Sequence, residues 1–169
     1  MDHPPAQTAQ RARVSSRERV LAALAAHGLA EAEVREFAES TATAVDAAAA
    51  IGTSVERIVK SLVFAAGDKP ILVLASGPNR VDTARVSQLL GLPIARANAD
   101  QVRAWTGFAI GGVPPLAHAT PLQTLVDQDL LQFDRVWAAA GTPNAVFAID
   151  PNDLVRITGA QVAEVAQAG

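Results

Sequence analysis

Apolar positions along the chain follow two spacings, which predict two kinds of element. Repeats at three- and four-residue intervals after a capping side chain predict helices, and short continuous apolar runs predict strands. Helices are predicted to begin at the cap residues Ser16, Thr43, Asp82, Asn98 and Asp150. A last helix is predicted from Thr158, with Val162 and Val165 facing inward. Strands are predicted at residues 33–37, 58–66, 71–75, 123–127, 135–139 and 145–149.

The predicted strands cluster in hairpins, with helices between and around them. Residues 58–66 and 71–75 flank a turn and form one hairpin. The second of these strands is apolar on both faces, which predicts a central, covered strand. This order favours an α+β fold, with a mixed, mostly antiparallel sheet and helices packed on it. We expect a single domain over residues 15–169 after a disordered tail over residues 1–14.

The composition of the chain excludes several kinds of functional site. The 169 residues are 50% hydrophobic and include no cysteine, so disulfides and thiolate nucleophiles are excluded. The three histidines do not stand at ligand spacing, and no metal site is predicted. A net charge of −3 argues against wrapping duplex nucleic acid, whereas a short single-stranded end needs only a few cations. No apolar run is long enough for a membrane span, so no membrane partner is expected.

A glycine- and proline-rich segment, residues 107–118, stands out from the regular pattern. Gly111 and Gly112 precede Val113 and two prolines, so the free N–H groups in the middle of the loop are those of Gly111, Gly112 and Val113. A fixed row of amide donors suits a carbonyl oxygen, an oxyanion or a phosphate. The simpler alternative is a tight turn between two elements.

Lys60 is a cation inside an apolar strand. It is a candidate for binding a ligand, and the alternative is an edge lysine that faces solvent and blocks aggregation. No serine-hydrolase elbow, phosphate-binding loop or dinucleotide motif occurs in the chain. Lys60 and the glycine loop are therefore the two candidates for ligand binding or catalysis.

Together these segments resemble a known family. The run Ile58-Val59-Lys60-Ser61-Leu62, the loop from Gly107 to Pro115, and the stretch from Gly141-Thr142-Pro143 to Leu154 are similar to the YbaK-like editing domains. These are also called the prolyl-tRNA synthetase-associated domain family, and they hydrolyse wrongly charged aminoacyl-tRNA. The resemblance runs from about residue 15 to the end of the chain. Thr41, Thr43 and the alanine-rich helix ending at Gly52 also fit it.

The resemblance implies a barrel-like α+β fold and a free-standing deacylase that acts without metal or cofactor in the cytoplasm. Its substrate would be a mischarged tRNA, foremost tRNA for proline carrying cysteine or alanine. The implied partners are the tRNA acceptor end and an aminoacyl-tRNA synthetase, with a monomer or a homodimer as the working form. The implied catalytic residues are Lys60, Gly111 and Gly112. The implied substrate-binding residues are Phe37, Thr41, Thr43, Ser61, Val113, Pro115, His118, Gly141, Thr142 and Val146.

Two positions depart from the family pattern. Ala117 stands where many members have a further glycine, and Val146 stands where some single-domain members have an acidic residue. An apolar wall at Val146 predicts a change in the amino acid accepted. Two other functions stay open at this point, a non-catalytic module that binds a tRNA end or a protein, and an unrelated small-molecule binder.

Overall fold

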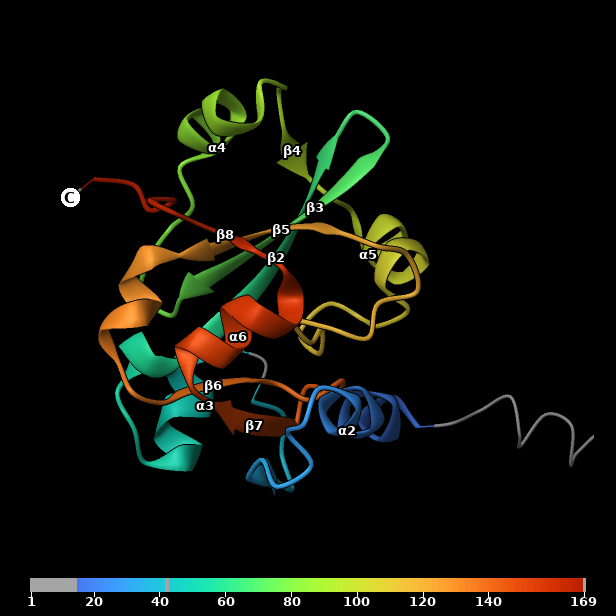
Figure 1. Cartoon of the computed structure of the whole chain (residues 1–169), viewed down its shortest axis with the longest axis vertical. Coiled ribbons are helices and arrows are strands. Elements are labelled where there is room, and N and C mark those ends of the chain that lie inside the picture. Colours follow the sequence, from blue (N-terminus) through green and yellow to red (C-terminus); the bar gives the residue numbers. More distant parts are fainter. Residues whose placement is uncertain (1–14, 42, 169) are drawn as a thin grey trace, which may run out of the picture.

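The computed structural model describes residues 15–41 and 43–168 (Figure 1). The predicted disordered tail, residues 1–14, lies outside the described residues. None of the helices in the described part of the chain is long and apolar enough to span a bilayer. The helices are α2 (Ser16–Ala26), α3 (Ala44–Ile51), α4 (Thr83–Leu90), α5 (Ala99–Thr106) and α6 (Pro151–Thr158), with 3-10 turns at Val55–Arg57 and Gln128–Gln132.

The helix ends follow from local capping. Thr43, Asp82 and Asn98 each accept a backbone N–H of the first turn through a side-chain oxygen, and Asn98 forms a reciprocal capping box with Gln101. These predictions are confirmed. For α2 the predicted cap is one residue off, because Ser15 and not Ser16 accepts the N–H of Glu18.

The strands of the described chain are β1 (Val34–Glu36), β2 (Val59–Ala66), β3 (Lys69–Ser76), β4 (Ala95–Arg96), β5 (Gln123–Asp127), β6 (Val136–Ala139), β7 (Ala145–Ile149) and β8 (Gln161–Ala163). They form two sheets. The larger has the order β4-β2-β3-β5-β8, in which β2 and β3 form the predicted hairpin and β3 is central, with β5 and β8 running parallel to it. The smaller has the order β1-β7-β6, all antiparallel.

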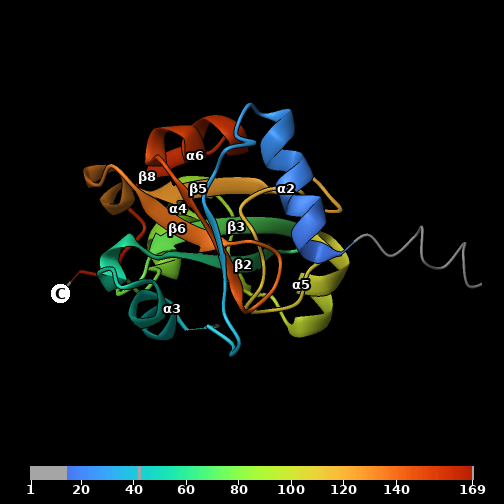
Figure 2. The same cartoon turned by 90° about the horizontal axis from the view of Figure 1, so that it is seen from below.

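An isolated bridge joins the two sheets at the start of β2. Ile58, just before β2, forms a parallel bridge with Trp137 of β6, while β4 pairs with β2 only at Phe64 and Ala65. The helices and the two sheets confirm the predicted α+β class. The predicted barrel-like form is not confirmed, because neither sheet closes on itself in the described chain. Figure 2 shows α2 and α6 on one side of the strands and α3 and α5 on the other.

The helix predicted from Thr158 is wrong. Residues Gln161–Ala163 form β8, which pairs in parallel with Leu125–Asp127 of β5. Val165 is buried as expected, but Val162 is partly exposed. The spacing of three between Val162 and Val165 also fits one face of a helix, which is why a helix was expected. In a strand, this segment forms backbone hydrogen bonds with the edge of β5, and a helix at the same place would leave those N–H and C=O groups of β5 unpaired.

Candidate functional site

A cavity of about 500 Å³ opens beside β2, where the two sheets diverge. Residues 58–63 line one wall, the first turn of α3 and the glycine loop line others, and β6 and β7 form the floor. This volume lies within the range of small-molecule sites. Eight of the predicted site residues line the cavity, namely Thr41, Thr43, Lys60, Ser61, Gly111, Val113, Thr142 and Val146.

Lys60 is half-buried in this cavity wall and does not act as a solvent-facing edge lysine. Its ammonium donates to the main-chain oxygen of Asn79 at 2.5 Å. The Asn79 amide in turn donates to the carboxylates of Asp127 and Asp129, at 2.8 and 2.7 Å. Asp127 is 1% exposed and also accepts the Ser76 N–H at 3.0 Å. The lysine is thus held by a polar network at the ends of β3 and β5.

The environment of Lys60 disfavours its charge. Partial burial lowers its pKa from the ordinary 10.5, the nearby guanidiniums of Arg96 and Arg80 lower it further, and Asp127 opposes them. Arg96 lines the same cavity, and neither Arg96 nor Arg80 forms an ion pair within the described residues. An anion at this place would meet Lys60 and Arg96, neither of which forms an ion pair within the described residues.

The glycine loop follows α5 directly, because Gly107 ends that helix in the left-handed conformation. Gly111 has φ +90° and, like Val113, lines the cavity. No acceptor for either N–H is present within the described residues. The expectation of a free Gly112 N–H is wrong, since it donates to Ala109 O at 3.0 Å. The amides that remain for a ligand are those of Gly111 and Val113.

Gly112 has a packing role instead. A Cβ at this position would lie 2.9 Å from Thr142 Cα and 3.0 Å from its carbonyl carbon. The glycine loop and the turn after Gly141 therefore approach each other closely at Gly112. Gly141 plays a similar part with φ +99°, because a Cβ there would lie 2.6 Å from Ser16 O at the start of α2.

The hydroxyls of the three predicted threonines all take part in hydrogen bonds of the fold. The N–H and hydroxyl of Thr41 both donate to Pro143 O, at 2.6 and 3.0 Å. Thr43 caps α3, and the Thr142 hydroxyl donates to Asn144 Oδ1 at 2.9 Å. The two Thr41 hydrogen bonds join the segment before α3 to the turn at Pro143. By contrast, the buried hydroxyl of Ser61 has no hydrogen-bond partner within the described residues.

The floor of the cavity is apolar. Ala47, Ile58, Trp137 and Val146 are all buried and pack in one cluster, with Phe37 behind them. The floor is also held firmly at its tryptophan. The guanidiniums of Arg35 and Arg135 each lie 4.9 Å from the Trp137 ring, and both form ion pairs with the carboxylate of Glu33.

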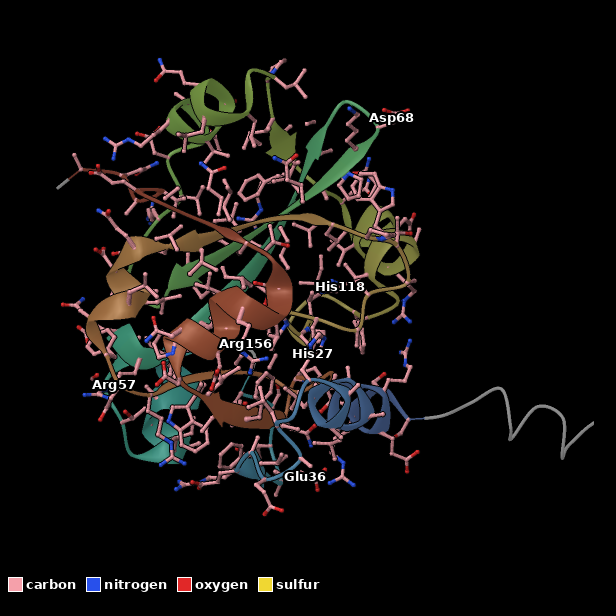
Figure 3. All side chains as sticks on the ribbon, in the orientation of Figure 1. His27, Glu36, Arg57, Asp68, His118 and Arg156 are labelled. Carbon is pink, nitrogen blue, oxygen red and sulfur yellow. The ribbon has the colours of Figure 1, made fainter. Side chains whose placement is uncertain are left out.

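Five predicted site residues do not line the cavity, namely Phe37, Gly112, Pro115, His118 and Gly141. Pro115 and His118 line a separate cavity of about 420 Å³ between the loop, α2 and α6. His118 and His27 lie close to the same space in Figure 3. Burial lowers the pKa of His118, and its Nε2 contacts Pro114 O at 2.7 Å. No group of three metal-ligating side chains occurs among the residues with described positions.

The structure adds residues that the sequence pattern did not indicate as site residues. Arg96 and Trp137 line the cavity, and Asn79 and Asp127 hold Lys60. Their positions come from pairing between distant strands, which leaves no local motif. Gly77 also lines the cavity, and a Cβ there would lie 2.1 Å from Val55 O, which is a close approach that only glycine permits.

Known proteins share the sequence pattern and the fold of this chain. A solved structure described as a "putative trans-editing enzyme for prolyl tRNA synthetase" matches with a TM-score of 0.87 and 46% identity, over 92% of this chain and 99% of that one. Protein YwhH of Bacillus subtilis (strain 168) is 35% identical over 133 residues, covering 78% of this chain and 85% of its own.

A third relative, from Enterococcus faecalis (strain ATCC 700802 / V583), carries the name "Putative Cys-tRNA(Pro)/Cys-tRNA(Cys) deacylase EbsC". It is 24% identical over 135 residues, which are 77% of this chain and 82% of that protein. The family model described as "Aminoacyl-tRNA editing domain" matches residues 38–157, the span that contains Lys60, the glycine loop and the apolar floor. The chain therefore belongs to the aminoacyl-tRNA editing domain family.

Proposed function

We propose that this chain is a free-standing deacylase that hydrolyses the ester bond of mischarged aminoacyl-tRNA. The observation that carries the proposal is that Lys60, Gly111 and Val113 line one cavity above an apolar floor, with no acceptor for the N–H groups of the two loop residues among the described residues. An aminoacyl ester is already activated, so hydrolysis needs mainly a positioned carbonyl and a positioned water.

The catalytic parts follow from these contacts. The free N–H groups of Gly111 and Val113 receive the ester carbonyl and stabilise the oxyanion; one such donor is worth about 3 kcal/mol in comparable transition states. Lys60 holds the terminal nucleotide by charge, and the unpartnered Ser61 hydroxyl offers a further hydrogen bond. The described lining includes no aspartate, glutamate or histidine. As the family resemblance implies, we propose that a hydroxyl of the substrate ribose assists the attacking water.

The substrate proposed is tRNA for proline carrying a small wrong amino acid, cysteine or alanine. The floor formed by Ala47, Trp137 and Val146 has no charged group to receive an ionic side chain. The names of two relatives point to the same class, one to prolyl tRNA synthetase and one to Cys-tRNA(Pro). Such an enzyme acts in the cytoplasm, where tRNA is charged, beside an aminoacyl-tRNA synthetase.

Contact with the RNA is confined to its acceptor end. Most arginines of the described chain are tied to carboxylates, including Arg85, which pairs with Glu164. The free cations near the cavity are Lys60, Arg96 and Arg80. The logarithm of the RNA-binding constant is therefore expected to fall only gently with the logarithm of the salt concentration. Each phosphate contacted on a single strand contributes about 0.7 to this slope, and only a few phosphates are contacted.

The test is a deacylation assay with a panel of charged tRNAs. The panel holds tRNA for proline carrying alanine, cysteine or proline, and the cognate Ala-tRNA and Cys-tRNA. Lys60→Ala is compared with Lys69→Ala, whose lysine lies on the exposed end of the hairpin outside the cavity. We expect Lys60→Ala to lose about 30-fold or more, as truncation of a desolvated charged partner costs about 2–5 kcal/mol.

Two results would contradict the proposal. Binding of uncharged tRNA with no hydrolysis of any panel member would support a non-catalytic module instead. Equal activity of Lys60→Ala and Lys69→Ala, with unchanged melting temperatures, would remove Lys60 from the site.

A further inference from the structure

Arg19 of α2 places a half-buried guanidinium against the start of the glycine loop. Its Nη2 donates to Gly107 O at 3.0 Å and to Ser16 Oγ at 3.3 Å, and its Cζ lies 4.4 Å from the centre of the Phe108 ring. No carboxylate forms an ion pair with Arg19 within the described residues. Outside its own helix, this cation thus contacts the place where the loop begins.

Packing alone does not require an arginine at this position. A half-buried guanidinium without a carboxylate loses hydration, and the Nε of Arg19 is buried with no hydrogen-bond partner in the described part of the chain. An arginine does supply geometry, because its planar group can stack on an aromatic face and donate in a fixed direction at the same time. Gly107 is also the C-cap of α5, where the negative end of the helix dipole favours a cation. These features favour a role in fixing the loop over a role in filling space.

The residues that Arg19 contacts are joined to the helix before them. Phe108 is buried, and its N–H donates to the buried Thr106 hydroxyl at 3.0 Å. Gly107 has φ +80° and ends α5, and its N–H donates to Arg103 O at 2.8 Å. Arg19 therefore connects α2 to a buried point at the end of α5.

The amides proposed to act on the ester follow shortly after this point. The Gly112 N–H donates to Ala109 O at 3.0 Å, which closes a tight turn just after Phe108. Val113 is buried in the same core cluster as Phe108. A shift at the start of the loop is therefore passed to the N–H groups of Gly111 and Val113.

The first turn of α2 also meets the second loop of the site. A Cβ at Gly141 would lie 2.6 Å from Ser16 O. Thr142, the next residue, is the close neighbour of Gly112. The two loops thus pack on each other and on α2, although no residue of α2 lines the cavity itself. The contribution of α2 to the site is indirect.

We propose that Arg19 is a positioning residue of the site. Its hydrogen bond to Gly107 O and its stacking on Phe108 hold the start of the glycine loop. This contact fixes where the N–H groups of Gly111 and Val113 lie in the cavity wall. The effect on hydrolysis rests on the proposed function, because it requires that these amides receive the ester carbonyl. The effect on the order of the loop does not.

Two substitutions at Arg19 test this role. Arg19→Met keeps an unbranched side chain over Phe108 but removes the donors, and Arg19→Lys keeps the charge but not the planar group. The first control is Arg17→Met, because Arg17 lies in the same turn and pairs with Glu36 at the surface. The second control is Val86→Ala, which opens space in the separate core cluster beneath α4 and lowers stability away from the loop.

Backbone order parameters, single-turnover deacylation rates, the RNA concentration at half saturation and melting temperatures are measured for each protein. In Arg19→Met, we expect the order parameters of the Gly111 and Val113 amides to fall from about 0.85 toward about 0.6. The rate should fall about tenfold or more, because small displacements of reacting groups are costly. The half-saturating concentration should change by less than about twofold, since Arg19 does not line the cavity.

The other variants distinguish positioning from stability. Arg19→Lys is expected to lie between the parent and Arg19→Met in both loop order and rate. Both controls should keep the loop order and the rate of the parent, although Val86→Ala melts at a lower temperature.

The inference is overturned if Arg19→Met keeps the loop order or the rate of the parent. It is also overturned if Val86→Ala loses as much rate as Arg19→Met at an equal fall in melting temperature. The same criteria apply to Arg19→Lys if Arg19→Met does not fold. If the parent hydrolyses no charged tRNA, the proposed deacylase activity fails, and the order parameters alone decide the role of Arg19.

Discussion

The substitution Gly112→Ala tests the close packing of the two loops beside the cavity. Gly112 does not need a positive φ; what it needs is space, because an added Cβ would lie 2.9 Å from Thr142 Cα and 3.1 Å from Gly141 O. These neighbours are backbone atoms, so no side chain can rotate away. The glycine loop and the turn at Thr142 must move apart by a few tenths of an ångström.

The size of the effect follows from overpacking. Forcing a methyl group into a well-packed place costs about 1–3 kcal/mol. For a chain of 169 residues, about 2 kcal/mol corresponds to a fall in melting temperature of roughly 4–8 °C. The movement also displaces the amides of Gly111 and Val113 relative to Lys60. Since misplacement by 1 Å can cost about 100-fold in rate, at least about a tenfold loss of deacylation is expected.

The matched control is Gly67→Ala. Gly67 has φ +66° in the hairpin turn, with nothing within 4 Å of an added Cβ, so the substitution costs only the left-handed conformation, about 1 kcal/mol. Thermal melting and single-turnover deacylation are measured for both variants. If Gly112→Ala melts at or above the temperature of Gly67→Ala and keeps the parent rate, the loops are not closely packed and the reasoning is refuted.

Three further outcomes are expected. Ala117 has φ +70°, so Ala117→Gly should raise the melting temperature by about 1–4 °C, and a fall would show that its methyl packing outweighs the strain. Burial lowers the pKa of His118, so below pH 6.5 the unfolded chain binds a proton first and stability falls with acidification; His118→Asn should flatten this dependence in urea titrations. Burial and Arg96 lower the pKa of Lys60, so background-corrected deacylation should decline from a lower pH than 10.5 as the ammonium is lost, and Lys60→Arg should remove that decline.

Local chemistry explains which parts of the fold could be predicted from the sequence. The caps at Thr43 and Asp82, the Asn98 capping box and the turn at Gly67 each depend on residues within a few positions. Strand β8 was missed because its partner, β5, lies more than 30 residues earlier, and three residues carry too little pattern to distinguish a strand from a helix.

Two parts of the candidate site could be predicted, because each shows an unusual residue pattern in the sequence. A lysine in an apolar strand and paired glycines before prolines were visible in the sequence, and the structure brings Lys60 and Gly111 to one cavity. Two parts of the site were not predictable, because each joins segments far apart in the sequence. The Asn79–Asp127 support of Lys60 forms where β3 and β5 end, and Trp137 reaches the cavity where the two sheets meet at Ile58. The engagement of the Gly112 amide likewise depends on how the loop folds back on Ala109.

The most direct test of the central claim is the first-order rate of ester hydrolysis under enzyme excess. Alanyl- and cysteinyl-tRNA for proline are mixed with the parent, Lys60→Ala or Lys69→Ala, and the remaining aminoacyl-tRNA is followed in time. The proposed mechanism predicts that the parent and Lys69→Ala hydrolyse at least one of the two esters at the same rate. Lys60→Ala should be slower by about 30-fold or more with an unchanged melting temperature. No hydrolysis above the spontaneous rate by the parent, or equal rates for all three proteins, would contradict it.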